Sequence, residues 1–194
     1  DGQRTTVRRS GVVEPAGEPL ELGLLDGVLD EVRIENPAAR PSGVAQWLFD
    51  GDLRDASEHG HHLSGKDVSF APVPGGQALK LAKQGAQVAS DPSLQLAPGF
   101  RIDLSVCFEQ LPPEGRYIVV KNGEYQLRLN SQKEGGGFAF FVNLSTWEPR
   151  VTSTERVVAG QWYRLTAQWD GFALTLDVNG QRRRTMRSGL AKAT

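Results

Sequence analysis

Residues 162–180 read WYRLTAQWDGFALTLDVNG. Apolar and polar side chains alternate through residues 162–169 and again through residues 174–178, which is the period of a β-strand with one buried face. Asp170-Gly171 and Asn179-Gly180 follow these two runs. Such pairs favour tight hairpin turns because both residues tolerate a positive φ. The stretch therefore predicts consecutive antiparallel strands joined by short turns.

The same alternation extends upstream of this stretch. Residues 100–108 place apolar side chains on one face of a strand, and residues 125–129 return from a turn at Asn122-Gly123. Glycine and proline number 22 and 11 among 194 residues, which suits a chain with many turns. No sustained helical period competes. The sequence therefore predicts an all-β fold, an antiparallel two-sheet sandwich.

Composition excludes several classes of function. The 22 Lys and Arg residues balance 23 Asp and Glu residues, and the net charge of −1 offers no global field to attract nucleic acid. No apolar run approaches the roughly 20 residues needed to cross a bilayer. Cys107 is the single cysteine, so an internal disulfide is excluded. Its apolar neighbours predict a small buried side chain rather than a reactive thiol.

Three segments carry a resemblance to a known family. Gly-x-Trp, Asp-Gly and Val-Asn-Gly in residues 160–181 resemble the signature of laminin-G-like domains of the concanavalin A-like lectin/glucanase superfamily. WLFDG at 47–51, with the loop at 55–62, resembles the family's opening strand, and LDGVLDEVRIEN at 25–36 resembles its closing strand. The resemblance implies a jelly roll of two curved sheets, and a family that is mostly secreted or on the cell surface and binds glycans or proteins.

The order of these segments differs from that of the family, because the closing strand precedes the opening strand. Residues 1–12 also resemble residues 179–190, at an offset of 178 residues. Coincidence between two arginine-rich turns is the alternative. We interpret residues 1–40 as the closing-strand segment of a repeat, permuted or from the preceding repeat, and residues 41–194 as the sandwich body. The N-terminal segment is expected to supply the closing strand within one chain, or else to a neighbouring molecule.

Asp30 is the first candidate metal ligand. Strict alternation along its strand would place Asp30 on the same side as Val32 and Ile34, where a carboxylate needs hydrogen bonds, a partner or a cation. Similar laminin-G-like domains often carry a structural Ca²⁺ beside the loop after the opening strand. The resemblance implies a calcium site there, with the candidate ligands Asp30, Asp50, Asp52 and Asp55. The alternative is that Asp30 accepts backbone hydrogen bonds without a metal.

Two other chemistries are disfavoured. His59, His61 and His62 share one loop, but adjacent histidines in extended chain point apart and no cysteine lies nearby, so zinc is a poor interpretation. Glu31 and Glu35 share a strand face, but they lie roughly 13 Å apart with Arg33 between them, which is typical of a charged outer surface. The sequence therefore predicts that the chain is not an enzyme.

Sugar recognition commonly combines an aromatic platform with planar polar side chains. Trp147 lies in a loop where no core periodicity requires it, although it can also fold over a sheet edge as core. Arg128, Asn130 and Asn143 lie on the polar faces of neighbouring predicted strands. These four residues are the candidate ligand-binding set. Arg182, Arg183 and Arg184 divide between two strand faces, which favours a solvated edge over a nucleic-acid patch.

These observations favour a noncatalytic binding module from a tandem array. The expected location is extracellular, cell-surface or periplasmic. The expected partners are a glycan or an extracellular protein, together with neighbouring repeats of the same protein, and neither nucleic acid nor a membrane span is expected. A glycan-active hydrolase of the same superfamily and a purely structural repeat are the alternatives. A hydrolase would show two facing carboxylates across a concave sheet.

Overall fold

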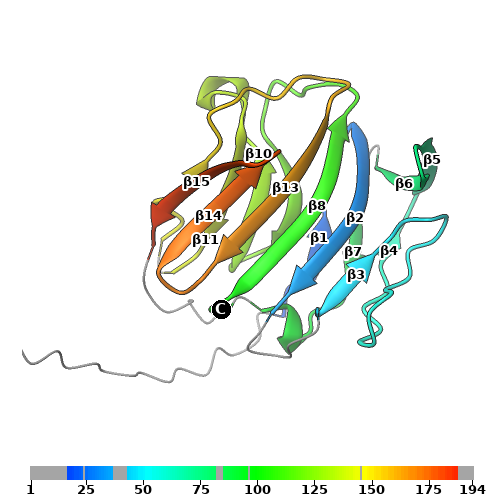
Figure 1. Cartoon of the computed structure of the whole chain (residues 1–194). Coiled ribbons are helices and arrows are strands. Elements are labelled where there is room, and N and C mark those ends of the chain that lie inside the picture. Colours follow the sequence, from blue (N-terminus) through cyan, green and yellow to red (C-terminus); the bar gives the residue numbers. More distant parts are fainter. Residues whose placement is uncertain are drawn as a thin grey trace, which may run out of the picture.

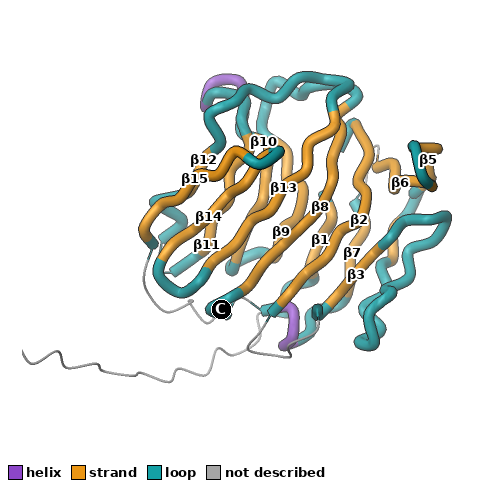
Figure 2. Tube along the Cα trace, in the orientation of Figure 1, coloured by secondary structure: helices purple, strands orange, loops and turns teal. Residues whose placement is uncertain are grey.

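Two antiparallel sheets pack face to face in this chain (Figures 1 and 2). The computed structural model describes residues 17–23, 25–36, 43–81, 85–95, 97–144 and 146–187. In these ranges the helical elements are two single 3₁₀ turns, η1 (Pro92–Leu94) and η2 (Gln132–Glu134). No helix in the described part of the chain is long and apolar enough to cross a membrane. The all-β antiparallel sandwich predicted from the sequence is confirmed.

One sheet has seven strands, in the order β12-β11-β10-β9-β1-β7-β4. Their bounds are β12 (Val151–Thr152), β11 (Phe138–Val142), β10 (Tyr125–Leu129), β9 (Arg116–Lys121), β1 (Leu20–Leu22), β7 (Ala86–Val88) and β4 (Ser64–Gly65). All of the pairings are antiparallel. This sheet lies behind the other one in Figure 1.

The second sheet has eight strands, in the order β15-β14-β13-β8-β2-β6-β5, and β3 pairs β2 beside this path. Their bounds are β15 (Gln181–Met186), β14 (Ala173–Val178), β13 (Trp162–Trp169), β8 (Phe100–Phe108), β2 (Gly27–Glu35), β6 (Gly76–Leu81), β5 (Ser69–Val73) and β3 (Ala45–Trp47). The hairpin of β13 and β14 turns at Asp170-Gly171, as its sequence predicts.

The core lies between the two sheets. It is built from the alternating apolar side chains of both inner faces, such as Ile102 and Leu104 on β8 and Leu127 on β10. Trp47 and Trp169 are fully buried among them. Each indole donates a hydrogen bond, Trp47 to the His61 carbonyl at 2.8 Å and Trp169 to the Arg187 carbonyl at 3.1 Å. The large aromatic side chains therefore bury their area without leaving a donor unpaired.

The N-terminal segment closes the sandwich within one chain. β1 pairs β7 and β9 in one sheet, and β2 lies between β8 and β6 in the other. The expected closing strand, residues 25–36, therefore occupies the centre of its sheet and also pairs the opening strand, β3. Residues 1–12, the expected duplicate of β15, lie outside the described ranges. The division of the chain at residue 40 stays a prediction.

A β-bulge interrupts β2 and reverses the predicted orientation of Asp30. Asp30 pairs Ser105 and Arg33 pairs Asp103, so the β2 strand holds one more residue than β8 between these pairs. Glu31 adopts a φ of 49°, in the left-handed region. The extra residue moves Asp30 to the outer face with Val28, while Leu29, Val32 and Ile34 enter the core. The expectation that Asp30 shares a face with Val32 and Ile34 is therefore wrong.

Candidate functional site

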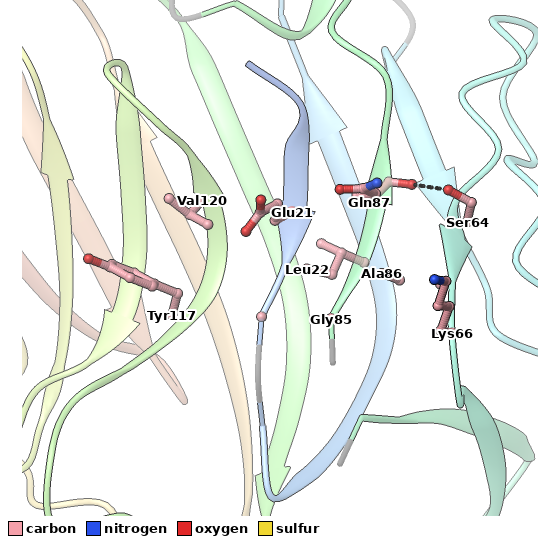
Figure 3. A pocket seen from close by; sticks show the side chains of 11 residues that line it. Glu21, Leu22, Ser64, Lys66, Gly85, Ala86, Gln87, Tyr117 and Val120 are labelled. Carbon is pink, nitrogen blue, oxygen red and sulfur yellow. Dashed lines mark hydrogen bonds between the residues drawn. The ribbon is translucent and has the colours of Figure 1, made fainter. Parts of the chain in front are cut away.

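A hollow lies on the outer face of the seven-stranded sheet, and we call it the sheet groove (Figure 3). Its volume is about 520 Å³. The lining residues come from β1, β4, β7 and β9 and from their ends: Glu21, Leu22, Gly23, Ser64, Gly65, Lys66, Gly85, Ala86, Gln87, Tyr117 and Val120. Four strands that are distant in the sequence therefore build one surface.

A row of side chains crosses this face at right angles to the strands. Register places Gln126 opposite Val120, Val120 opposite Glu21, Glu21 opposite Gln87, and Gln87 opposite Ser64. Figure 3 shows Glu21 between Val120 and Gln87. At about 4.8 Å between strands, the row spans roughly 19 Å. A carboxylate, two amides and a hydroxyl thus face solvent along one line.

Tyr117 supplies the aromatic surface of the sheet groove. Tyr117 is 43% exposed, so its ring presents an aromatic surface on the outer face of the sheet. Arg128 lies opposite Tyr117 on β10, at the point where the register of β9 and β10 shifts. An exposed ring beside a polar row can receive a ligand that has both an apolar face and hydroxyl groups.

Glycines keep the floor of the sheet groove free of side chains. A Cβ on Gly23 would lie 1.7 Å from the Tyr117 carbonyl oxygen, and a Cβ on Gly85 would lie 2.2 Å from the Leu22 carbonyl oxygen. Both contacts are with backbone, so neither position accepts a larger residue without moving a strand. The close approach of β1 to its neighbours therefore depends on glycine at these two positions.

Arg128, a predicted ligand-binding residue, lies in a cation–aromatic cluster. The guanidinium carbons of Arg128 and Arg150 lie 4.7 and 5.0 Å from the centroid of the Phe141 ring. Both guanidinium groups also contact Glu134 Oε1 at 2.7 Å. Arg150, together with hydrogen bonds from Ser131 and the charge of Arg128, lowers the pKa of Glu134 to about 2. The Arg128 guanidinium group is thus held by Phe141 and Glu134.

The other predicted ligand-binding residues do not converge on the sheet groove. Asn130 is buried and accepts a hydrogen bond from Arg128 Nε at 3.2 Å. Asn143 lies at the opposite end of the β10–β11 hairpin and donates to the Gly123 carbonyl at 2.9 Å. Trp147 is partly buried in the loop between β11 and β12. The structure therefore brings Arg128 and Asn130 together and places Asn143 at the other end of the hairpin.

Asp55, a predicted calcium ligand, organises the loop after β3. Its carboxylate accepts hydrogen bonds from the backbone N–H groups of Gln46, Ser57 and His61, each at 2.9 Å, and from Ser57 Oγ at 2.6 Å. Burial raises the pKa of this carboxyl, but the hydrogen bonds outweigh it, so the net pKa is lowered. Both oxygens of Asp55 therefore already have protein donors.

The remaining candidate calcium ligands lie in two places. Asp52 is exposed and accepts from the Arg54 N–H at 3.0 Å. Asp30 and Asp50 line one small hollow of about 140 Å³, next to the turn between β5 and β6. Burial, partly offset by the Glu31 N–H, together with the charges of Glu31 and Asp50, raises the pKa of Asp30. Among the described residues no three His, Cys, Asp or Glu side chains form a metal-binding group. The four residues together do not fit one calcium site.

The three histidines take separate structural roles. His62 Nδ1 accepts from the Asp55 N–H at 3.0 Å, and His61 is buried with Nε2 2.9 Å from Ser93 Oγ. Ser93 Oγ in turn donates to Asp91 Oδ1 at 2.6 Å. Because its proton goes to the aspartate, Ser93 is not arranged as a nucleophile activated by His61. The cluster ties the loop after β3 to η1.

Sequence reasoning did not identify Glu21, Gln87 or Tyr117. β1 and β7 are three residues long, so each offers one outward side chain and no period to detect. Tyr117 directly precedes the apolar residues Ile118, Val119 and Val120, so the sequence gives no sign that its ring is exposed. The available signal was the single polar residue in Leu20-Glu21-Leu22, which marks an outer face once the strand is known.

Comparison with known proteins identifies one family. A family model described as the concanavalin A-like lectin/glucanases superfamily matches residues 82–192, more than half of the chain. No curated protein and no solved structure matches the chain.

Proposed function

Because the chain belongs to the concanavalin A-like lectin/glucanase superfamily, we propose that it is a noncatalytic module that binds a glycan in the sheet groove. The observation that carries the proposal is the row of Glu21, Gln87 and Ser64 beside the exposed Tyr117 ring. Aromatic rings accept the apolar face of a sugar, and planar polar side chains bind its hydroxyl groups. The direction of the row favours an extended chain lying across the strands.

A glycan hydrolase is the competing function within the same superfamily. Hydrolysis by the usual mechanisms needs two carboxyl groups about 5–9.5 Å apart on either side of the scissile bond. Of the described residues that line the sheet groove, Glu21 is the single carboxylate. Glu31 and Glu35 belong to β2, in the other sheet. This distribution favours binding over hydrolysis.

We extend the proposal to the setting of the module. An extracellular, cell-surface or periplasmic location suits a glycan or an extracellular protein as the partner. The likeness of residues 1–12 to residues 179–190 supports a tandem array in which neighbouring repeats also contact one another. A purely structural repeat would bind no glycan, so the binding experiment separates that possibility as well.

The test is a glycan array followed by calorimetry with the strongest ligand. Tyr117→Ala should weaken binding at least tenfold, because it removes the aromatic surface. Phe172→Ala is the matched control, since Phe172 is an exposed ring at the end of the other sheet, and it should bind as the unmodified protein does.

Other results would indicate a different binding site or a different function. Loss of binding in Trp147→Ala, with Tyr117→Ala unaffected, would move the site to the loop between β11 and β12, provided that thermal melting shows the variant folded. New reducing ends released from the bound glycan would establish a hydrolase instead. A chain that binds nothing on the array would leave the structural repeat as the function.

A further inference from the structure

A second hollow lies on the opposite side of the molecule, on the outer face of the eight-stranded sheet. Its volume is about 360 Å³. Trp162, Arg164 and Asn179 form one wall, Val73 and Pro74 of the β5–β6 turn form the other, and Asp30 and Ser105 lie between them. We call this hollow the bulge pocket, because the bulge in β2 is what turns Asp30 toward it.

Register defines the spacing of the charged groups in the bulge pocket. Arg164 pairs Ser105, and Ser105 pairs Asp30, so the three residues form one row across β13, β8 and β2. Two strand spacings separate the backbones of Arg164 and Asp30 by about 9.6 Å. Ser105, between them, has a short side chain. The carboxylate and the guanidinium group therefore face a common space that no side chain of their row fills.

The charges of Asp30 and Arg164 are not neutralised by a short ion pair in the described part of the chain, although the Arg164 charge helps to lower the pKa of Asp103. Within the described ranges, neither residue forms an ion pair, and the one hydrogen bond to the Asp30 carboxylate comes from the adjacent Glu31 N–H at 3.0 Å. Three other carboxylates of the face each have an arginine: Asp103 with Arg101 at 2.6 Å, Glu35 with Arg33 at 2.9 Å, and Asp177 with Arg182 at 3.6 Å.

The walls of the bulge pocket are apolar around these charges. Trp162 is 38% exposed, although it belongs to a strand whose alternate residues fill the core. Val73 packs against the small cluster of Val28, Ala78 and Cys107 that covers this part of the sheet. Pro74 continues the same wall. An indole and a proline on opposite sides form a slot for an apolar group between two opposite charges.

We propose that the bulge pocket binds a small zwitterion with an apolar body, namely a free α-amino acid. Its ammonium group contacts the Asp30 carboxylate, and its carboxylate contacts the Arg164 guanidinium group. Its side chain lies between Trp162 and Pro74. Charge-assisted hydrogen bonds at both ends give the site its selectivity, because a ligand lacking one charge leaves a protein charge unpaired.

The experiment titrates the full chain with L-leucine, L-leucine methyl ester and N-acetyl-L-leucine by calorimetry. L-leucine should give saturable heat. The ester lacks the carboxylate and the acetyl derivative lacks the ammonium group, so each should bind at least about tenfold more weakly. Methyl α-glucoside, a neutral polyol, should give no heat at this site.

Matched variants locate the binding. Asp30→Asn and Arg164→Gln should each weaken L-leucine at least about tenfold. Glu31→Gln removes the neighbouring carboxylate, and Arg183→Gln removes an exposed arginine of β15; both should bind within about twofold of the unmodified protein. In amide NMR spectra, the Trp162 indole N–H signal, assigned with Trp162→Phe, should shift on titration.

Several results would overturn the proposal. Absence of saturable heat with L-leucine is one of them. Equal affinity for the methyl ester or the acetyl derivative would show that only one charge is recognised. An equal loss in Asp30→Asn and Glu31→Gln would show general electrostatics instead of a site. None of these results depends on glycan binding in the sheet groove, which lies on the other sheet.

Discussion

Lys121 and Glu124 form an ion pair inside the sandwich, with Lys121 Nζ 2.9 Å from Glu124 Oε1. Their side chains are 0% and 1% exposed. Lys121 Nζ also donates to the Glu18 carbonyl at 3.1 Å and to Ser90 Oγ at 3.4 Å. One ammonium group therefore joins the β9–β10 turn to the segment before β1 and to the end of β7.

Glu124→Gln should lower the free energy of unfolding by about 3–5 kcal/mol, because it removes the carboxylate that pairs with the buried Lys121 ammonium group. Urea denaturation measures this change. Glu109→Gln is the control, since Glu109 pairs Lys80 at 2.5 Å on the surface, with 49% and 39% of the side chains exposed. Its effect should stay within about 1 kcal/mol. Equal effects of the two variants would contradict the structural role of the buried pair.

Glu134 should make the chain less stable in acid. Its pKa is lowered to about 2 in the folded protein, from an ordinary value of 4.5. Because this pKa is lower in the folded protein, the ionised Glu134 carboxylate stabilises the fold fully above about pH 4.5. This contribution is lost as pH falls from about 4.5 toward 2. Glu134→Gln should therefore flatten the decline of the melting temperature over this range. Glu114→Gln, an exposed loop variant, should keep the original slope.

Calcium binding stays a prediction, and we assign it to one hollow because two of its four candidate ligands, Asp30 and Asp50, line that hollow together. If the ion binds there, EDTA should lower the melting temperature, and added Ca²⁺ should restore it by mass action. Asp50→Asn should abolish the response, and Asp52→Asn should preserve it, because Asp52 does not line that hollow. Unchanged melting after EDTA would rule the site out.

Removal of residues 1–40 should prevent folding of the remaining chain. The deletion takes away β1 and β2, and so opens both sheets in their interiors. β8 would then expose unpaired N–H and C=O groups beside the core, which favours aggregation. Solubility and size-exclusion chromatography measure the outcome. A soluble monomer that melts cooperatively would show that the N-terminal segment is dispensable.

The long strands could be predicted from the sequence, whereas the outer surfaces could not. Residues 100–108 and 162–169 alternate strictly, and both are strands with the predicted inner faces. β1 and β7 are too short to show a period, so the sequence marks the sheet groove only by the polar residue between two leucines in Leu20-Glu21-Leu22. Its shape arises from pairing between residues as distant as Glu21 and Val120.

Asp30 shows a second limit of sequence reasoning. Alternation predicts which face of a sheet a side chain lies on only while the strand stays regular. One additional residue at Glu31 reverses the predicted face of every β2 residue before it. Asp-Glu within an apolar strand gives no sign of a bulge, since Glu31 is neither glycine nor asparagine. Asn143 lies away from Arg128 for another reason, namely that shared polarity does not place residues at the same end of a hairpin.

The central place of β2 also bears on how the chain is synthesised. About 75 residues separate Asp30 from its partner Ser105, so β2 leaves the ribosome well before β8 exists to receive it. At about 5–20 residues per second, this delay is roughly 4–15 s. Leu29, Val32 and Ile34 have no partner strand at β8 during that interval, and a nascent chain with such a segment is a natural client for a holding chaperone. The eight-stranded sheet can therefore be completed only after the ribosome has synthesised β8, in the second half of the polypeptide.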